Sequence, residues 1–372
     1  MNADLLTITA AVARRPGEPF SIEQLKLEPP RPDEVLVRIV AAGMCHTDLK
    51  TKDGPHMPHP MVLGHEGAGV VERVGSAVHK LQPGDPVVLT FMSCGRCSRC
   101  LRGEPAYCEL IMPLCFGGAR EDGSTATHGA DGPIHDHFFG QSSFATYALA
   151  SERNAIKVPK DAPLELLGPF GCGLPTGAGA VINALKVGVG QSLAVFGAGA
   201  VGMAAIMAAR IVGATTIVAV DLFDSRLDLA RELGATDVVS GRAPDQVAQI
   251  MAATSGKGVD FALDATGTDK VMATAMQVLA HRGTCGFVGG AAPGATTAVD
   301  LGWLMTGGRT LRGILEGDAV PDQFIPALIE LHRQGRFPFE KLVKVYELND
   351  INRAAHDSES GKVIKPVIRM PA

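Results

Sequence analysis

The stretch SLAVFGAGAVG (192–202) decides the fold of the second half of this chain. Its first five residues have the apolar composition of a buried strand, and Gly197, Gly199 and Gly202 follow in the spacing G-x-G-x-x-G. The next apolar run ends at Asp221, 24 residues after Gly197. A strand, this glycine pattern and an acidic residue at that distance together predict a dinucleotide-binding βαβ unit.

Each glycine of the pattern has a physical task in such a unit. Gly197 permits a tight turn, Gly199 lets the backbone approach a pyrophosphate, and Gly202 lets the helix pack closely on the strand. Asp221 would accept hydrogen bonds from the adenosine ribose hydroxyls and repel a 2′-phosphate, which favours NAD over NADP. Arg226 either contacts that ribose or lies on a solvated helix face.

Strand and helix patterns alternate from this unit to about residue 315. We expect a helix from 200 onward and a second helix with Ser225 as its N-cap. The six expected strands are SLAVFG, TTIVAVD, TDVVS, VDFALDATG, GTCGFVGG and RTLRGIL. This alternation predicts an α/β fold, a doubly wound parallel Rossmann domain over 174–314. The uncharged run 187–209 is then a buried strand, turn and helix rather than a membrane span.

The first half of the chain is β-rich in pattern. Segments such as EVLVRIVAAG (34–43) and GAGVVERVG (67–75) are apolar and rich in β-branched residues, and turns separate them. Residues 111–137 form a long irregular stretch, which in a compact domain is usually functional or mobile. We expect one domain over 1–173 and 315–372, with 174–314 inserted as the other.

Length and composition agree with two globular domains. The 372 residues are 46% hydrophobic and 20% charged, which excludes an intrinsically disordered chain. A net charge of −5 gives no electrostatic reason to bind nucleic acid or an anionic membrane. The N-terminal stretch lacks the pattern of a signal peptide, so we expect a cytoplasmic protein. In that setting clustered cysteines usually bind metal.

Four of the eight cysteines are clustered in one short segment. They are Cys94, Cys97, Cys100 and Cys108. Four thiolates in tetrahedral arrangement hold structural Zn²⁺ with no open position, and short spacings let one loop wrap the ion. Disulfides or free thiols are the alternative. A zinc ion here would hold a loop and take no part in a reaction.

A second set of candidate metal ligands is dispersed along the chain. Cys45 lies in GMCHTD, His65 and Glu66 in GHEGAG, and Cys172 in GPFGCG. Taken alone, each has an ordinary interpretation, since a single buried cysteine is usually part of the packing. Two thiolates and one imidazole would leave zinc a fourth, open position, which is the catalytic arrangement.

These motifs, in this order, resemble those of the zinc-dependent medium-chain alcohol dehydrogenases. Residues 64–78 match the zinc signature of that family, and the resemblance covers essentially the whole chain. The stretches CHTDL (45–49), FFGQSSFATYAL (138–149) and ELLGPFGCGLPTGAG (165–179) resemble the branch of bacterial aryl-alcohol (benzyl-alcohol) and geraniol dehydrogenases. The resemblance implies a GroES-like catalytic domain and a homodimer or homotetramer, in which residues 296–314 could supply an edge strand.

The resemblance also implies which residues bind the metal. Cys45, His65 and Cys172 would be the ligands of the catalytic zinc. Glu66 would lie beside the zinc, either supporting its ligands or serving as a transient fourth ligand, and Asp48 would orient His65. With the structural site, two zinc ions per chain are implied.

The resemblance further implies how the reaction proceeds. A hydride would pass reversibly between a zinc-bound alkoxide and NAD, and Thr47 would bond the alcohol and begin removal of its proton. His46 and Lys365 would lie near the NAD pyrophosphate, and Thr176 near the nicotinamide. Lys50 stands where many relatives have a histidine at the outer end of the proton relay. An ammonium is a poor proton acceptor at neutral pH, so bulk water or His46 could take that role.

The candidate substrate pocket is apolar. Its residues are Phe138, Phe139, Phe91 and Met92, for which ordinary core packing is the alternative. Such a pocket separates apolar substrates by only about 1–3 kcal/mol per methylene, so benzyl-type and allylic alcohols such as geraniol both fit. Cys115 could line the substrate channel, and Cys285 is expected in the core.

Two other functions stay open. A dehydrogenase of S-(hydroxymethyl)glutathione must recognise carboxylates, and residues 111–137 offer only Arg120 among four acids. A non-catalytic NAD-binding protein could use the same fold, although it would be expected to lose zinc ligands or the relay hydroxyl. The histidines at 128, 135 and 137 are interpreted as surface or loop residues rather than a third metal site.

Overall fold

The computed structural model describes residues 5–371, so the first four residues of the stretch examined for a signal peptide lie outside it. The chain divides into two compact units. The first comprises residues up to Cys172 with Val320–Ala327 and residues from Glu340 onward, and the second comprises Gly173–Ala319 with Leu328–Phe339. The predicted boundaries assigned 328–339 to the first domain, whereas these residues pack with the second unit.

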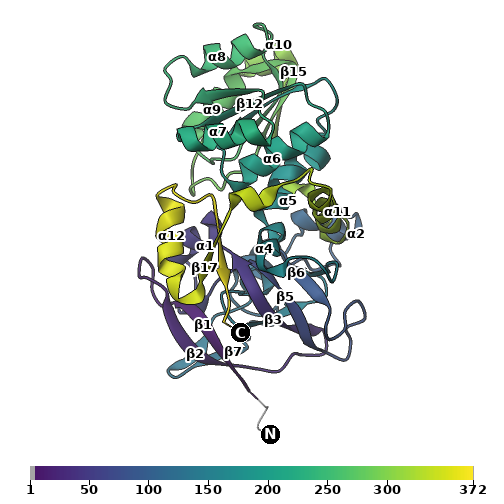
Figure 1. The fold of residues 1–372 in the computed structure, drawn as a ribbon, viewed down its shortest axis with the longest axis vertical. Coiled ribbons are helices and arrows are strands. Elements are labelled where there is room, and N and C mark those ends of the chain that lie inside the picture. The colour runs from purple at the N-terminus through teal and green to yellow at the C-terminus, as the bar shows by residue number, and fades with distance from the viewer. Residues whose placement is uncertain (1–4, 372) are drawn as a thin grey trace. The chain divides into compact units, whose positions relative to one another are not determined.

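The second unit is built on a six-stranded parallel sheet, as expected from the alternating pattern (Figure 1). Its strands in spatial order are β13 (Asp237–Ser240), β12 (Thr216–Asp221), β11 (Ser192–Phe196), β14 (Val259–Asp264), β15 (Leu279–Phe287) and β16 (Thr310–Gly313). The order reverses between β11 and β14, and in such sheets a ligand binds beyond the carboxyl ends of the strands at this point. Strand β11 leads directly to the glycine pattern.

Helices cover this sheet because apolar strands of a parallel sheet need cover on both faces. They are α6 (Ala200–Ile211), α7 (Asp224–Leu233), α8 (Gln246–Ala253), α9 (Asp269–Gln277) and α10 (Leu301–Gly307). Helix α5 (Gly173–Gly179) packs against α6. Ser225 is not an N-cap, because α7 begins one residue before it and Phe223 occupies the cap position. Helix α6, which follows the glycine pattern, is more apolar than α7, and most of its residues are buried.

The first unit contains two β-sheets, as a GroES-like domain requires. One has the strands β4 (Met61–Val62), β1 (Leu6–Ala13), β2 (Ser21–Leu27), β7 (Thr127–Gly129) and β8 (Gly132–Ile134). The other has β10 (Ala155–Lys157), β6 (Pro86–Leu89), β5 (Glu66–Val74), β3 (Glu34–Gly43), β18 (Lys365–Arg369) and β17 (Val343–Glu347), with β9 (Tyr147–Ser151) also paired to β3. Strand β3 is nearly all buried because it pairs with three other strands.

The remaining helices are short, apart from α11. They are α1 (His46–Asp53), α2 (Ser98–Leu101), α3 (Ile111–Phe116), α4 (Leu164–Leu167), α11 (Pro321–Arg333) and α12 (Ile351–Glu359). Single turns lie at η1 (Pro105–Tyr107), η2 (Phe138–Gly140), η3 (Gly168–Gly171), η4 (Ala180–Ala184), η5 (Glu316–Asp318), η6 (Phe339–Leu342) and η7 (Leu348–Asp350). The stretch 111–137, predicted as irregular, contains α3 and the hairpin β7–β8, which extends the first sheet through β2.

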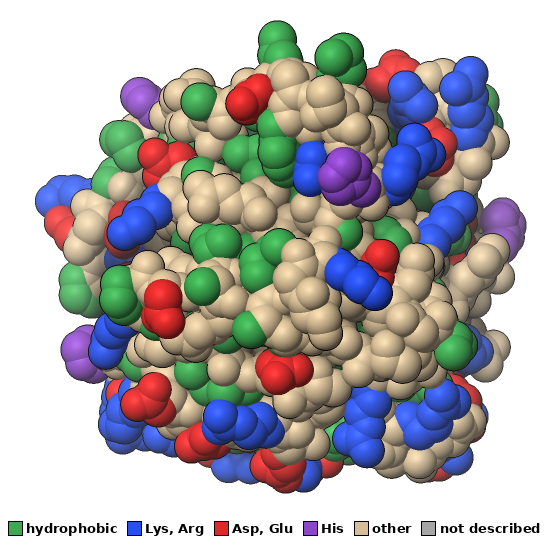
Figure 2. All heavy atoms as spheres, turned by 90° about the horizontal axis from the view of Figure 1, so that it is seen from above, with side chains coloured by type: hydrophobic (Ala, Val, Ile, Leu, Met, Phe, Trp, Pro, Cys, Tyr) green, Lys and Arg blue, Asp and Glu red, His purple; other side chains and the backbone are tan. Residues whose placement is uncertain are grey.

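Within residues 5–371, no helix is both long and apolar enough to cross a membrane. On the face shown in Figure 2, cationic and anionic side chains are interspersed. That mixture shows no broad field of one sign on this face, and the expectation of no nucleic-acid partner stays a prediction.

Candidate active site

The structure brings the four dispersed metal-ligand candidates together in the first unit. Cys45, His65, Glu66 and Cys172 each offer a ligand atom, and these atoms all lie within 4.8 Å of one another. Cys45 caps the N-terminus of α1, the pair 65–66 opens β5, and Cys172 follows η3. Three separate chain segments therefore converge on one small buried volume.

Asp48 joins two of these segments by hydrogen bonds. Its Oδ1 accepts hydrogen bonds from Nδ1 of His65 at 2.9 Å and from the backbone N–H of Gly64 at 3.0 Å. Its Oδ2 accepts the backbone N–H of Cys45 at 2.9 Å. Because the carboxylate can only accept, the proton of the His65 ring lies on Nδ1, and Nε2 carries the lone pair.

The Nε2 atom of His65 fits a metal ligand. It is fully buried and has no hydrogen-bond partner in the part of the chain that the structure describes. A buried polar atom of this kind is rare unless something binds it. Burial lowers the pKa of His65, but the Asp48 carboxylate raises it by more, so Asp48 favours a cation, either a proton or a metal ion, on Nε2. The pKa of Cys45 is lowered by its hydrogen bond with Cys172, which favours the thiolate that binds metal.

Glu66 is held by a buried lysine. Nζ of Lys365 lies 2.9 Å from both carboxylate oxygens of Glu66 and 3.2 Å from the carbonyl oxygen of Met44. Lys365 is only 3% exposed, and although burial lowers its pKa, the Glu66 charge raises it further, so the ammonium persists. The structure thus places Lys365 on Glu66, and a contact with the NAD pyrophosphate stays a prediction.

The four clustered cysteines form the second candidate metal site. Their sulfur atoms all lie within 4.8 Å of one another. Backbone N–H groups point at the sulfurs, from Cys97 to Cys94 at 3.3 Å and from Leu110 to Cys108 at 3.4 Å. The backbone N–H of Cys100 lowers the pKa of the Cys97 thiol to about 6. Burial instead raises the pKa of Cys100 to about 12. Four sulfurs gathered within this distance have the ligand chemistry of a structural zinc site.

The glycine pattern of the second unit has the predicted close approaches. Gly197 has a φ of +90°, and a Cβ on Gly202 would lie 1.8 Å from the Gly197 carbonyl oxygen. A Cβ on Gly199 would meet nothing within 4 Å, so the backbone there is open to a ligand. Asp221 ends β12, and its Oδ2 accepts the N–H of Ala198 at 2.7 Å. The acidic group therefore lies directly at the glycine loop.

The other predicted cofactor and relay residues make contacts within their own units, and their roles stay predictions. Arg226 packs on the Phe223 ring and lies 3.9 Å from Asp221, so it is not on a solvated face. Thr176 lies on α5 with its hydroxyl 3.3 Å from Oε2 of Glu316. His46 and Lys50 are exposed on α1, and the Thr47 hydroxyl lies 3.8 Å from Sγ of Cys45.

Comparison with known proteins agrees with this architecture. Residues 31–160 match the alcohol dehydrogenase GroES-like domain, and residues 200–333 match the zinc-binding dehydrogenase family. The geraniol dehydrogenase of Castellaniella defragrans is 49% identical over 367 residues, which is 98% of each chain. The chain belongs to the zinc-dependent alcohol dehydrogenase family.

Two solved structures of such dehydrogenases are similar throughout. The alcohol dehydrogenase zinc-binding domain protein from Burkholderia ambifaria has 58% identity and a TM-score of 0.97, over 99% of this chain and 100% of that one. The benzyl alcohol dehydrogenase of Acinetobacter calcoaceticus has 47% identity and a TM-score of 0.96, with the same coverage.

Two aromatic rings contact the candidate metal ligand His65 of this dehydrogenase. The Phe139 ring lies 4.5 Å from the His65 ring, centroid to centroid, at an angle of 31°, and the Phe138 ring lies edge-on at 5.5 Å. Phe116, which the sequence did not single out, contacts both phenyl rings at 5.7 and 5.0 Å. We call Phe116, Phe138 and Phe139 the aromatic wall.

All four pocket candidates belong to the packed interior of the first unit. Phe138, Phe139 and Phe91 are 0%, 6% and 4% exposed and share one core, against which Met92 and Phe116 pack. Cys115 is fully buried with its thiol 3.5 Å from the Met92 carbonyl oxygen, so it does not line an open channel. Cys285 is buried in the core of the second unit, as expected.

Gln141 supports the backbone beside the candidate ligands, and the sequence did not reveal it. Its Nε2 donates to the carbonyl oxygens of His65 at 2.9 Å and Thr90 at 3.1 Å, and its Oε1 accepts from the N–H of Gly67 at 3.0 Å. It therefore fixes the backbone on both sides of the ligand pair 65–66. A buried polar residue inside the apolar stretch 138–149 is the signal that could have indicated it.

Proposed function

We propose that this alcohol dehydrogenase oxidises a primary aromatic or allylic alcohol, such as benzyl alcohol or geraniol, reversibly to its aldehyde with NAD. The observation that carries the proposal is the aromatic wall packed on the metal ligand His65. Aromatic side chains favour flat, unsaturated partners by offset or edge-to-face contacts. The similarity to a geraniol dehydrogenase and to a benzyl alcohol dehydrogenase supports the same substrate class.

Each residue of the cluster has a task in this reaction. Cys45, His65 and Cys172 would hold zinc, which as a Lewis acid lowers the pKa of an alcohol hydroxyl. The Thr47 hydroxyl, 3.8 Å from Sγ of Cys45, is placed to accept the proton of that alcohol. From Thr47 the proton leaves toward solvent, where His46 and Lys50 are exposed. The ammonium of Lys50 does not accept it, so His46 or water does.

The proposed cofactor preference rests on Asp221. Its carboxylate is buried at the end of β12 and tied to the glycine loop by the Ala198 N–H, so it cannot swing away from a ribose. NAD bound at this loop would supply the hydride acceptor. A fixed negative charge disfavours the 2′-phosphate of NADP, while the open approach at Gly199 leaves room for the pyrophosphate.

The glutathione-adduct alternative is less well supported. Arg120, the only lysine or arginine of residues 111–137, is 8% exposed and bonded to two carboxylates. It is therefore unavailable to the carboxylates of glutathione. The non-catalytic alternative has no support either, since the predicted ligand set and relay hydroxyl are together in the structure.

The proposed homodimer or homotetramer rests on the edge of the second unit's sheet. Strand β16 ends that sheet, and on the adjacent α10 the side chains of Leu301 and Met305 are 75% and 77% exposed. An apolar edge of this kind suits pairing with a second copy. A solution mass of 38.8 kDa, that of one chain, would contradict an oligomer.

The proposal is tested by NADH formation from a panel of substrates, with zinc measured on the same sample. The panel contains benzyl alcohol, geraniol, ethanol, and formaldehyde with glutathione. Fast turnover of benzyl alcohol or geraniol, slow turnover of ethanol and two zinc ions per chain are expected. Turnover of the glutathione adduct alone would replace the proposal by its alternative.

A further inference from the structure

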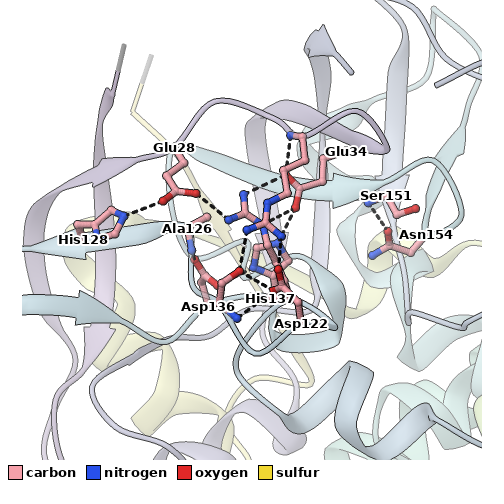
Figure 3. Close-up of polar contacts among 12 residues, drawn as sticks. Glu28, Glu34, Asp122, Ala126, His128, Asp136, His137, Ser151 and Asn154 are labelled. Atoms are coloured by element: carbon pink, nitrogen blue, oxygen red, sulfur yellow. Dashed lines mark hydrogen bonds and ion pairs between the residues drawn. The ribbon is translucent and has the colours of Figure 1, made fainter. Parts of the chain in front are cut away.

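A buried group of charges lies in the first unit, apart from the metal ligands. Arg120 donates to both carboxylate oxygens of Glu34, at 2.7 and 3.0 Å, and to Glu28 at 2.7 Å. His137 bridges the same Glu34, at 3.4 Å from Nε2, and Asp136, at 2.5 Å from Nδ1 (Figure 3). Asp136 in turn accepts the N–H of Ala126 at 2.8 Å. We call these five side chains, from Glu28, Glu34, Arg120, Asp136 and His137, the charge cluster.

The charge cluster ties the chain before the aromatic wall to the sheet. Glu34 opens β3, and Glu28 follows directly after β2, so both acids are anchored on strands. Asp136 and His137 follow β8 and lie at the end of the segment that carries Arg120. Buried charges are retained only when they are paired, and here each one has a partner of opposite sign.

His137 also sets the backbone that leads to the aromatic wall. It has a φ of +54°, and Phe139, two residues later, has a φ of +53°. Side chains other than glycine rarely adopt this left-handed region, so neighbouring contacts must hold it. Asn154 helps by donating to the carbonyl oxygens of Phe139 at 3.2 Å and Gly140 at 3.0 Å. Within the turn, the carbonyl oxygen of His137 accepts the N–H of Gly140 at 2.7 Å, and the Ser142 hydroxyl accepts the N–H of Phe138 at 3.0 Å.

We propose that His137, clamped between Glu34 and Asp136, is a positioning residue that holds Phe138 and Phe139 against the metal ligand His65 and so sets the preference for aromatic substrates. The connection is short, because Phe138 and Phe139 follow His137 directly and their rings lie 5.5 and 4.5 Å from the His65 ring, centroid to centroid. The raised pKa of His137, about 9, agrees with a clamped imidazolium at neutral pH: burial lowers it, but Asp136 more than compensates.

This proposal rests on the proposed function only for the class of substrate. A merely structural role of His137 would reduce all activities alike, together with stability. A positioning role instead changes the ratio of kcat/KM for benzyl alcohol to that for ethanol, which is too small to use the aromatic wall. Ethanol oxidation therefore serves as the internal reference.

The test compares His137→Gln with His128→Gln in the zinc-loaded protein. Glutamine is neutral and cannot bridge two carboxylates as an imidazolium does. His128 is the matched control, because it contacts the outer face of the same cluster, 3.2 Å from Glu28, and its side chain is 39% exposed. His137→Gln is expected to lower the benzyl alcohol to ethanol ratio by about tenfold, mainly through a higher KM for benzyl alcohol. His128→Gln should leave it unchanged.

Hydrogen exchange provides a readout that needs no activity. The N–H groups of Gly140 and Phe144 are bonded to the carbonyl oxygens of His137 at 2.7 Å and Leu63 at 3.0 Å. Amides of residues 140–144 should exchange about tenfold faster in His137→Gln and as in the wild type in His128→Gln. An unchanged exchange or substrate ratio in His137→Gln, or equal changes in both variants, would overturn the proposal.

Two further outcomes remain informative. If His137→Gln does not fold, Asp136→Asn takes its place as the test. The asparagine amide oxygen can still accept the Ala126 N–H, but the negative charge that pairs with His137 is lost. This variant must lower the benzyl alcohol to ethanol ratio and speed the exchange of amides 140–144. If the wild type oxidises no aromatic or allylic alcohol, the proposed function fails. The exchange comparison then still decides whether His137 positions the segment.

Discussion

Nδ1 of His65 donates to Oδ1 of Asp48 at 2.9 Å, and both side chains are completely buried. This one bond leaves Nε2 of His65 as the only ring nitrogen able to bind a metal, and it directs that atom at Cys45 and Cys172. The same carboxylate holds the backbone of Cys45 at 2.9 Å. One aspartate thus orders two ligands of the candidate catalytic site.

Asp48→Asn should weaken zinc binding and turnover together. An amide can still accept from one donor, but it lacks the charge that keeps the proton on Nδ1 of His65. Losing a carboxylate behind a metal-binding histidine typically costs about 10–100-fold in metal affinity or activity. Zinc titration with a competing chelator, alongside kcat, checks this. Wild-type affinity in the variant would show that Asp48 does not orient the ligand.

The two cysteine sites should respond differently to substitution. Cys45→Ser should abolish turnover and remove about one zinc ion per chain while folding is retained. Cys100→Ser should instead lower the melting temperature and solubility, because its four-sulfur site is a folding element. Metal analysis and calorimetry of both variants check the assignment. Normal melting and normal zinc in Cys100→Ser would refute the structural role.

Asp221→Gly should change the cofactor preference. The variant loses the carboxylate that would bind the ribose hydroxyls and repel a 2′-phosphate. A charged hydrogen bond contributes about 1.5–3 kcal/mol, so kcat/KM for NAD should fall about 10–100-fold relative to that for NADP. Asp237→Gly, an exposed acid on the next strand, is the matched control. An unchanged NAD to NADP ratio in Asp221→Gly would remove Asp221 from the cofactor site.

Stability should fall at alkaline pH through His137. Its pKa is raised from 6.5 to about 9 because Asp136, opposed by burial, stabilises the imidazolium. A group with a raised folded pKa stabilises the protein fully below its unfolded pKa, and this contribution is lost as pH rises toward the folded value. The loss amounts to about 3 kcal/mol at most. Melting temperatures between pH 6 and pH 10 should therefore decline less in His137→Gln than in the wild type; equal declines would count against the clamp.

Acidic pH should lower the stability of the folded protein through protonation of Glu34. Burial raises its pKa, but the ion pair with His137 and the hydrogen bonds from Arg120 outweigh this and bring the value to about 2. Its folded pKa is lowered, so the stabilisation is present above about pH 4.5 and disappears as pH falls toward 2. Together, the two groups place the best stability of the charge cluster between mildly acidic and neutral pH.

The sheet of the second unit was predictable from local sequence. Parallel strands buried on both faces read as apolar runs, and β11 and β12 lie within a residue of the expected segments. The start of α7 was not predicted correctly, because Ser225 and Asp224 are both plausible near a helix start and only the backbone of Phe223 decides between them. The first residue of a helix therefore depends on the backbone conformation of the turn that precedes it.

The surroundings of the metal ligands could not be predicted in the same way. The ligands themselves carry recognisable motifs, but Lys365 reaches Glu66 across 299 residues of chain. Arg120 and Glu34 are 86 residues apart, and a sequence with both signs of charge in a loop suggests a solvated surface rather than a buried cluster. Phe116 and Gln141 likewise acquire their places only when separate segments pack.

The most direct test of the account is the oxidation of benzyl alcohol deuterated at both hydrogens of its alcohol carbon. Zinc-loaded protein is mixed with this substrate and NAD, and the reduced nicotinamide is analysed by mass. One deuterium transferred per aldehyde formed, with a slower rate than for the undeuterated alcohol under single-turnover conditions, is the predicted result. Reduction without deuterium transfer, or no aldehyde from benzyl alcohol or geraniol with the zinc sites filled, would contradict it.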